Sequence, residues 1–198
     1  MNSVSVFKKQ WSSAPEIKDK ETLFSHLLKK RNLQAPEDIQ NYFIPAIKSL
    51  HDPFCMQDMQ KAVDRIFQAL LRKERIMIFG DFDSDGITST VILVHGLQQL
   101  GAKVSYRIPD RNRDSHGLKS YIIDEIADKN VSLIITCDCG VNDYQESAYA
   151  AKKGIDVIIT DHHDPDPNRF PKAAYAVVNP KLSTCTYPEK DLSGSGVA

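Results

Sequence analysis

The spacing of apolar residues predicts a helical first part of the chain, up to about residue 73. Leu23, Leu27 and Leu28 lie on one face of a helix, and Pro36 suits the first position of a second helix. Residues 43–53 connect to a third helix, in which apolar side chains recur at helical spacing up to residue 73.

From Arg75 onward, short apolar strands alternate with amphipathic helices. The strands are almost continuously apolar, which is typical of a parallel sheet covered on both faces. We therefore expect an α/β fold, a doubly wound, mainly parallel sheet with helices on both faces, preceded by a helical N-terminal segment. The predicted domains are a helical preface, 1–73, packed on an α/β domain, 74–198. The strands expected are 76–79, 104–108, 131–136, 155–160 and 174–178, and the helices are 87–100, 120–129 and 144–153.

Composition narrows the class of protein. Of 198 residues, 41% are hydrophobic and 26% charged, as in soluble globular proteins, and the net charge is −1. A nucleic-acid partner therefore needs a local basic patch or a bound cation. No apolar run approaches the ~20 residues of a membrane span, and the N-terminus lacks the apolar core of a signal peptide. Four cysteines suit a reduced, cytoplasmic protein.

Polar clusters follow three of the predicted strands. They read GDFDSDG at 80–86, CDCG at 137–140 and DHH at 161–163. The carboxyl ends of parallel strands share one edge of the sheet, so the clusters should meet there. Carboxylates and imidazoles so close together would repel and desolvate one another unless they held cations. This mixture suits Mn²⁺ or Mg²⁺ better than structural zinc.

Within the first cluster, Asp81 and Asp83 are two residues apart and share one side of an extended backbone, from which Phe82 points away. Asp85 lies at the start of the next helix, where we expect it to support the metal ligands rather than to bind a metal itself. The alternative is a turn in which Ser84 or Asp85 only caps that helix.

The other two clusters leave similar choices. Cys137 and Cys139 face away from Asp138, so they are either small buried hydrophobes or a thiol pair for zinc or redox chemistry. The adjacent His162 and His163 point in different directions. One can bind a metal while the other contacts the substrate or a core carbonyl.

Two further segments can hold a phosphate. The loop 108–117, at the same edge, carries Arg111, Arg113 and His116, although a solvated surface loop is the plain alternative. Gly194 and Gly196 can offer backbone N–H groups.

Taken together, these motifs resemble the DHH phosphoesterase superfamily and, within it, the RecJ-type single-strand-specific exonucleases. GDFDSDG with the following TSTVIL resembles the first motif, TCDCGV the second and VIITDHHDP the third. The resemblance continues through VVNPKL, YPEKDLSGSGVA and the end of the helical preface, so it covers nearly the whole chain.

The resemblance implies metal-dependent hydrolysis of single-stranded DNA from the 5′ end, in repair and recombination, using two Mn²⁺ or Mg²⁺ ions. Asp138 would bridge the ions, His163 would contact the scissile phosphate, Asp161 would orient a histidine and Arg111 would lie near the substrate. The implied partners are single-stranded DNA and repair or recombination proteins, with no membrane. The implied metal ligands are Asp81, Asp83, Asp138 and His162.

Two departures from the family pattern carry expectations. His116 stands where the family commonly has a tyrosine, so we expect altered substrate stacking or an added metal contact. The family's fourth motif and its second, DHHA1-type domain would follow Ala198. We therefore expect an incomplete catalytic lobe with weak metal binding and little activity.

Three other functions stay open at this point. The first is a DHH-type hydrolase of short oligonucleotides or cyclic dinucleotides. The second is a non-catalytic DHH scaffold, and the third is a phosphate-binding domain like those of response regulators, which has no role for the paired histidines.

Overall fold

The computed structural model describes residues 19–44 and 50–198. The chain divides into two compact units, 1–50 and 51–198. The third helix of the predicted preface thus belongs to the same unit as the sheet. The packing of the preface on the α/β domain stays a prediction. Residues 1–18 and 45–49, which include the N-terminal segment and part of the predicted connector, lie outside the described residues.

The first unit contains the two short helices expected from the sequence. They are α1 (Lys20–Lys30) and α2 (Pro36–Phe43), with Pro36 in the first turn of α2. Of the apolar face predicted on α1, Leu28 is buried, whereas Leu23 and Leu27 are exposed. The rings of Phe24 and Phe43 lie 5.7 Å apart.

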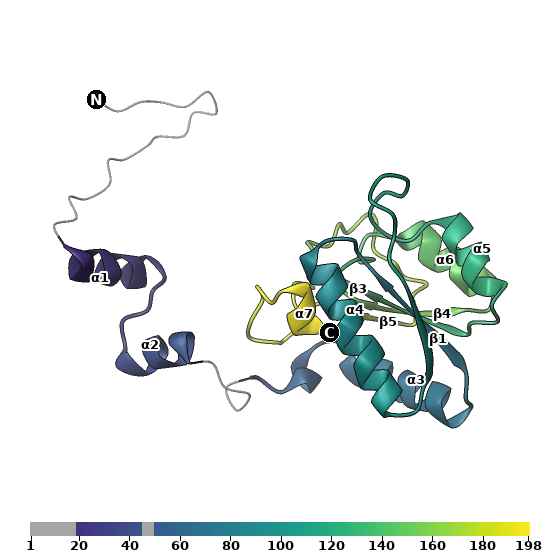
Figure 1. Cartoon of the computed structure of the whole chain (residues 1–198), viewed down its shortest axis with the longest axis horizontal. Helices are drawn as coiled ribbons and strands as arrows, with labels where there is room; N and C mark the ends of the chain where they lie inside the picture. Colours follow the sequence, from purple (N-terminus) through teal and green to yellow (C-terminus); the bar gives the residue numbers. More distant parts are fainter. Residues whose placement is uncertain (1–18, 45–49) are drawn as a thin grey trace. The chain divides into compact units, whose positions relative to one another are not determined.

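The second unit is built on a five-stranded, wholly parallel sheet in the order β2-β1-β3-β4-β5 (Figure 1). The prediction of a doubly wound parallel sheet is confirmed. β2 is an edge strand and is partly exposed, whereas β1, β3, β4 and β5 are almost wholly buried. The strands are β1 (Arg75–Gly80), β2 (Lys103–Arg107), β3 (Leu133–Cys137), β4 (Asp156–Thr160) and β5 (Ala176–Val178).

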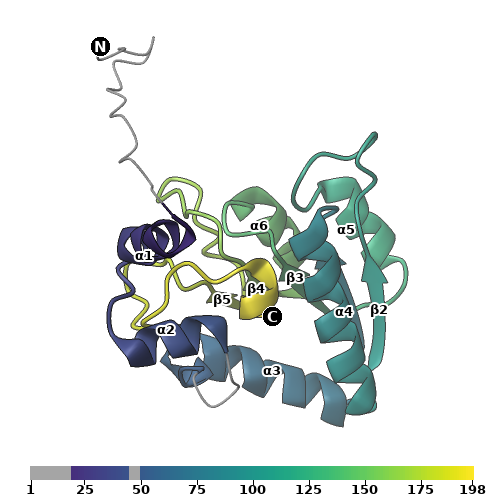
Figure 2. The same cartoon turned by 60° about the vertical axis from the view of Figure 1, so that its left-hand side comes forward.

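The connecting helices cover the sheet as right-handed crossovers require. From β1 the chain moves outward to β2 and then returns past β1 to β3, so α4 lies on one face while α5 and α6 pack together on the other (Figure 1). The short α7 lies beside α4 (Figure 2). The helical elements of this unit are η2 (Pro53–Cys55), α3 (Met59–Leu71), α4 (Ser84–Gln99), α5 (Ser120–Ala127), α6 (Tyr144–Lys152) and α7 (Gly194–Val197). No helix within the described residues is both long and apolar enough to cross a membrane.

The turn from β1 into α4 brings backbone segments very close together. A Cβ atom at Gly86 would lie 2.4 Å from the carbonyl oxygen of Asp81. Asp83, rather than Ser84 or Asp85, is the N-cap, because its Oδ1 accepts a hydrogen bond from Gly86 N–H at 3.0 Å. Helix α4 therefore begins at Ser84, three residues before the predicted start, and the alternative cap is wrong.

Helix α3 is anchored to the sheet by one buried cation. The side chain of Arg65 is only 6% exposed; its Nε lies 2.6 Å from Asp156 Oδ2 and its Nη2 lies 2.7 Å from Glu74 Oε2. Removing one partner of a buried ion pair leaves the remaining charges desolvated and uncompensated. Arg65 therefore joins α3 to the beginnings of β1 and β4.

We expect Arg65→Met to lower the free energy of unfolding by about 3 kcal/mol, because the largely buried Glu74 would lose its 2.7 Å partner and keep only the exposed Arg72 at 3.7 Å. Chemical denaturation measures this loss. Arg72→Met is the matched control: Arg72 is 67% exposed and lies 3.7 Å from Glu74, so its loss should cost less than about 1 kcal/mol. Equal losses for the two variants would contradict the anchoring role.

Candidate metal centre

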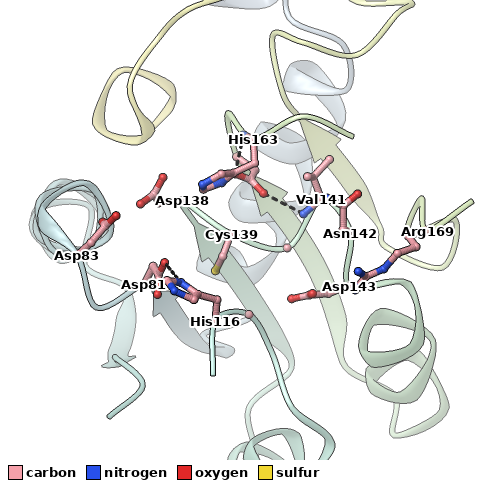
Figure 3. A pocket seen from close by; sticks show the side chains of 13 residues that line it. Asp81, Asp83, His116, Asp138, Cys139, Val141, Asn142, Asp143, His163 and Arg169 are labelled. Carbon is pink, nitrogen blue, oxygen red and sulfur yellow. Dashed lines mark hydrogen bonds and ion pairs between the residues drawn. The ribbon is translucent and has the colours of Figure 1, made fainter. Parts of the chain in front are cut away.

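The three polar clusters meet at the carboxyl edge of the sheet, as predicted. Two groups of side chains each bring one possible ligand atom per residue to within 4.8 Å of one another, and both groups include Asp138. They line or border a cavity of about 410 Å³ (Figure 3). The groups are Asp81, Asp83 and Asp138, and Asp138, His162 and His163.

Asp138 is the most constrained of these residues. Its side chain is 1% exposed, and neither carboxylate oxygen has a hydrogen-bond partner among the described residues. Its φ of 62° ends β3 and turns the carboxylate out of the strand. Burial, and then the negative charge of Asp83, raise the pKa of Asp138 to about 7. The protein by itself thus disfavours the ionised form, and a cation would favour it.

His162 is held as a metal-binding tautomer. Its Nδ1 lies 2.8 Å from the carbonyl oxygen of Leu192, which can only accept, so Nδ1 carries the proton. Nε2, the ring nitrogen left for a metal, lies 2.9 Å from Asp138 Oδ1, a close contact without hydrogen-bond geometry. A histidine oriented by a carbonyl in this way is typical of metal sites.

His163 is oriented by Asp161 instead. Its Nδ1 lies 2.7 Å from Asp161 Oδ1, and the N–H of Val141 donates to Asp161 Oδ2 at 2.9 Å. Although burial opposes it, these hydrogen bonds lower the pKa of Asp161. The hydrogen bond to Asp161 raises the pKa of His163 to about 9. His163 therefore brings a cationic ring, 55% exposed, to the cavity.

Asp81 is already engaged by two donors. Its Oδ1 accepts from Phe82 N–H at 2.8 Å, and its Oδ2 lies 2.7 Å from His116 Nδ1. The His116 ring packs on Phe82 at 4.3 Å between centroids. His116 thus reaches the candidate metal centre through Asp81.

Asp83 and Asp85 have separate surroundings. The Gly86 N–H holds the pKa of Asp83 below its usual range. Asp85 accepts hydrogen bonds from the N–H of Gly194 at 3.2 Å and the hydroxyl of Ser195 at 3.0 Å. It therefore fastens α7 to α4, with His162 Nε2 4.0 Å away.

The predicted phosphate-binding residues are less closely gathered. Arg111 is exposed, lies over the Phe82 ring at 5.2 Å and is not part of the cavity lining; Arg113 is also exposed. The N–H of Gly194 donates to Asp85, and that of Gly196 to Ser193 Oγ. Gly194 instead permits a close approach, because a Cβ there would lie 2.5 Å from Asp138 Oδ1.

The cysteine pair is buried, which favours the small-hydrophobe interpretation. Burial raises the pKa of Cys137 to about 11 and that of Cys139 well above its usual value. Neither thiol belongs to a candidate ligand group within residues 19–44 and 50–198. A thiolate site for zinc is therefore disfavoured.

Three residues of the cavity wall were missed by the sequence analysis. Asn142, Asp143 and Arg169 line the side away from Asp83 (Figure 3). Their positions in the sequence could have indicated them. The loops after β3 and β4 both lie at the carboxyl edge of the sheet, and Arg169 follows the DHH motif by six residues.

Comparison of the sequence with known proteins identifies the family to which these motifs belong. The DHH family N-terminal domain model matches residues 75–198. The chain is 43% identical over 176 residues to the single-stranded-DNA-specific exonuclease RecJ of Bacillus subtilis, covering 89% of this chain and 22% of that protein. It is 33% identical over 177 residues to the protein of the same name from Escherichia coli, covering 89% and 30%.

A solved structure supports the same assignment. RecJ from Thermus thermophilus, in complex with Mn²⁺, matches with a TM-score of 0.66 at 31% identity, over 86% of this chain and 22% of that one. The chain thus spans between about a fifth and a third of the length of the curated relatives named above. With its motifs gathered at one edge of the parallel sheet, the chain belongs to the DHH family.

Proposed function

We propose that this chain is the metal-binding part of a RecJ-type exonuclease, which hydrolyses phosphodiester bonds of single-stranded DNA from the 5′ end. The observation that carries the proposal is the Asp138 carboxylate, which is buried and has no hydrogen-bond partner among the described residues. An isolated buried carboxylate is costly unless a cation or donors compensate its charge. Among its neighbours, Asp81, Asp83 and His162 supply further ligand atoms.

The donor set fits two Mn²⁺ or Mg²⁺ ions. Asp81, Asp83 and His162 would join Asp138 as ligands, and the membership of Asp138 in both ligand groups supports its role as the bridge. Carboxylate and imidazole ligands suit these ions, and relatives with solved structures are bound to manganese or magnesium. When bound, a pair of such cations stabilises the charge that develops on a phosphate undergoing displacement.

Residues of the chain itself would bind and orient the phosphate. His163, held by Asp161, presents a protonated ring that would bind a phosphate oxygen and balance negative charge. Asp161 fixes the ring's orientation and is thus a positioning residue. Arg111 and the N–H groups of Gly194 and Gly196 stay proposals as phosphate contacts and would need to rearrange to reach the substrate.

The substrate is proposed from the relatives' names, single-stranded-DNA-specific exonuclease. With a net charge of −1, the chain offers little general attraction for DNA, so bound cations and local groups such as His163 would have to supply it. Action in the cytoplasm, with repair or recombination proteins as partners, completes the proposal.

Replacing Asp138 by Asn should abolish the stabilisation of the protein by Mn²⁺ without destabilising the metal-free protein. The change removes a buried, uncompensated charge and a central ligand while keeping the shape. Thermal unfolding with and without Mn²⁺ measures both effects. We expect the wild-type Tm to rise with Mn²⁺ and the variant Tm to be equal or higher without metal and to show no rise.

Asp124→Asn is the matched control, since this carboxylate pairs with Lys153 on the surface, outside the cavity lining. It should keep the full response to Mn²⁺. A D138N protein that still gains the wild-type increment would contradict the assignment of Asp138.

Replacing His116 by Phe should weaken Mn²⁺ binding by about tenfold. The ring would still pack on Phe82, but Asp81 would lose the donor that orients it, and such losses commonly cost 10–100-fold in metal affinity. A competition titration with a Mn²⁺ indicator measures the affinity. His95→Phe, on the exposed side of α4, should leave it unchanged; the same affinity for H116F and wild type would show that Asp81 needs no help from His116.

The activity itself is tested on the protein that carries this chain. With Mn²⁺, it should release nucleotides from long single strands labelled at the 5′ end, leave duplexes intact and lose at least 100-fold in rate with Asp138→Asn. A strong preference for dinucleotides or cyclic dinucleotides would favour the alternative hydrolase. Unchanged activity or binding in D138N would favour a non-catalytic scaffold.

A further inference from the structure

The cavity has two chemically different ends. One end holds the carboxylates and imidazoles of the candidate metal centre, and the other holds Arg169 (Figure 3). Arg169 is the only lysine or arginine in the cavity lining, as far as the described residues go. An arginine at the far end of the cavity from His163 is a second counter-charge for an anion that spans it.

The guanidinium of Arg169 is free to take a ligand. The guanidinium makes no ion pair or hydrogen bond with any residue of the described ranges 19–44 and 50–198. Only the backbone N–H of Arg169 is engaged, because it donates to the carbonyl oxygen of Asp166 at 2.9 Å. Asp143, the carboxylate on the same side of the cavity, accepts the N–H of Leu118 at 2.8 Å. The cation is therefore available to the cavity.

The loop that carries Arg169 is held in place beforehand. Asn142 clamps it from both directions, since its Nδ2 donates to Asp164 O at 3.1 Å and its Oδ1 accepts from Asp166 N–H at 2.7 Å. Asp166 Oδ1 in turn accepts the N–H of Asn168 at 2.9 Å. The backbone at Arg169 is thus tied to the loop after β3, so binding would cost only side-chain freedom.

We propose that Arg169 binds a second phosphate of the DNA strand, one nucleotide away from the phosphate held at Asp138 and His163. This inference rests on the proposed function and adds a substrate subsite to it. The cavity of about 410 Å³ has the size of a small-ligand site, and the candidate metal centre and Arg169 lie at opposite ends of it (Figure 3). Arginine recognises phosphate through two parallel hydrogen bonds, which lysine cannot reproduce.

The test uses three thymidine dinucleotides whose internal linkage is a phosphorothioate, to slow cleavage. One has no terminal phosphate, one has a 5′-phosphate and one has a 3′-phosphate. Each is titrated into the Mn²⁺-loaded chain, and binding is followed by NMR or calorimetry. Mn²⁺ affinity is measured separately for every variant.

Wild-type protein should bind one of the two phosphorylated dinucleotides about tenfold more tightly than the unphosphorylated one. The dinucleotide that gains affinity shows on which side of the scissile bond Arg169 lies. Arg169→Gln should remove the gain, Arg169→Lys should keep part of it, and neither should change Mn²⁺ affinity. Lys172→Gln, which removes an exposed charge three residues away in the sequence, should keep the gain in full.

A terminal-phosphate gain that survives in R169Q, or that is lost equally in K172Q, would overturn the inference. So would equal binding of all three dinucleotides by a chain that holds Mn²⁺ and binds the internal linkage. A chain that binds neither Mn²⁺ nor any dinucleotide would instead overturn the proposed function, so the two failures are distinguishable.

Discussion

The burial of the Asp138 carboxylate without a hydrogen-bond partner among the described residues is the constraint on which the rest of the site depends. Parallel strands all present their carboxyl ends at one edge, and here those ends bring Asp81, Asp83 and Asp138 together with two histidines. Without a cation, burial and then the negative charge of Asp83 raise the pKa of Asp138 to about 7. The buried carboxylate is therefore in an unfavourable environment that a bound cation would relieve.

Much of the surrounding structure serves to keep that carboxylate in its place. Gly86 lets the turn after β1 approach Asp81, and Gly194 lets α7 approach Asp138, where a Cβ would collide in each case. Asp85 fastens α7 to α4, and the Leu192 carbonyl just before α7 fixes the tautomer of His162. Gly194, which the sequence analysis considered only as a phosphate contact, thus also permits close packing of α7 against Asp138.

The sequence predicted the architecture because apolar strands and glycine-ended helices are strong local signals, and it predicted the meeting of the clusters because strand polarity determines where strand ends lie. The local geometry of the site could be predicted less well from the sequence. The cap at Asp83 was missed because its side chain can bind either a backbone N–H or a metal. The contact of His116 with Asp81 and the position of Arg169 depend on loops of no regular period, whose course is set by contacts with Asp143 and Asn142.

A crystal structure of the Mn²⁺-saturated protein, with anomalous differences recorded for manganese, tests the central claim most directly. The account predicts an anomalous peak about 2.0–2.4 Å from a carboxylate oxygen of Asp138 and from Nε2 of His162. A protein fully loaded with Mn²⁺ in which no ion contacts Asp81, Asp83, Asp138 or His162 would contradict it.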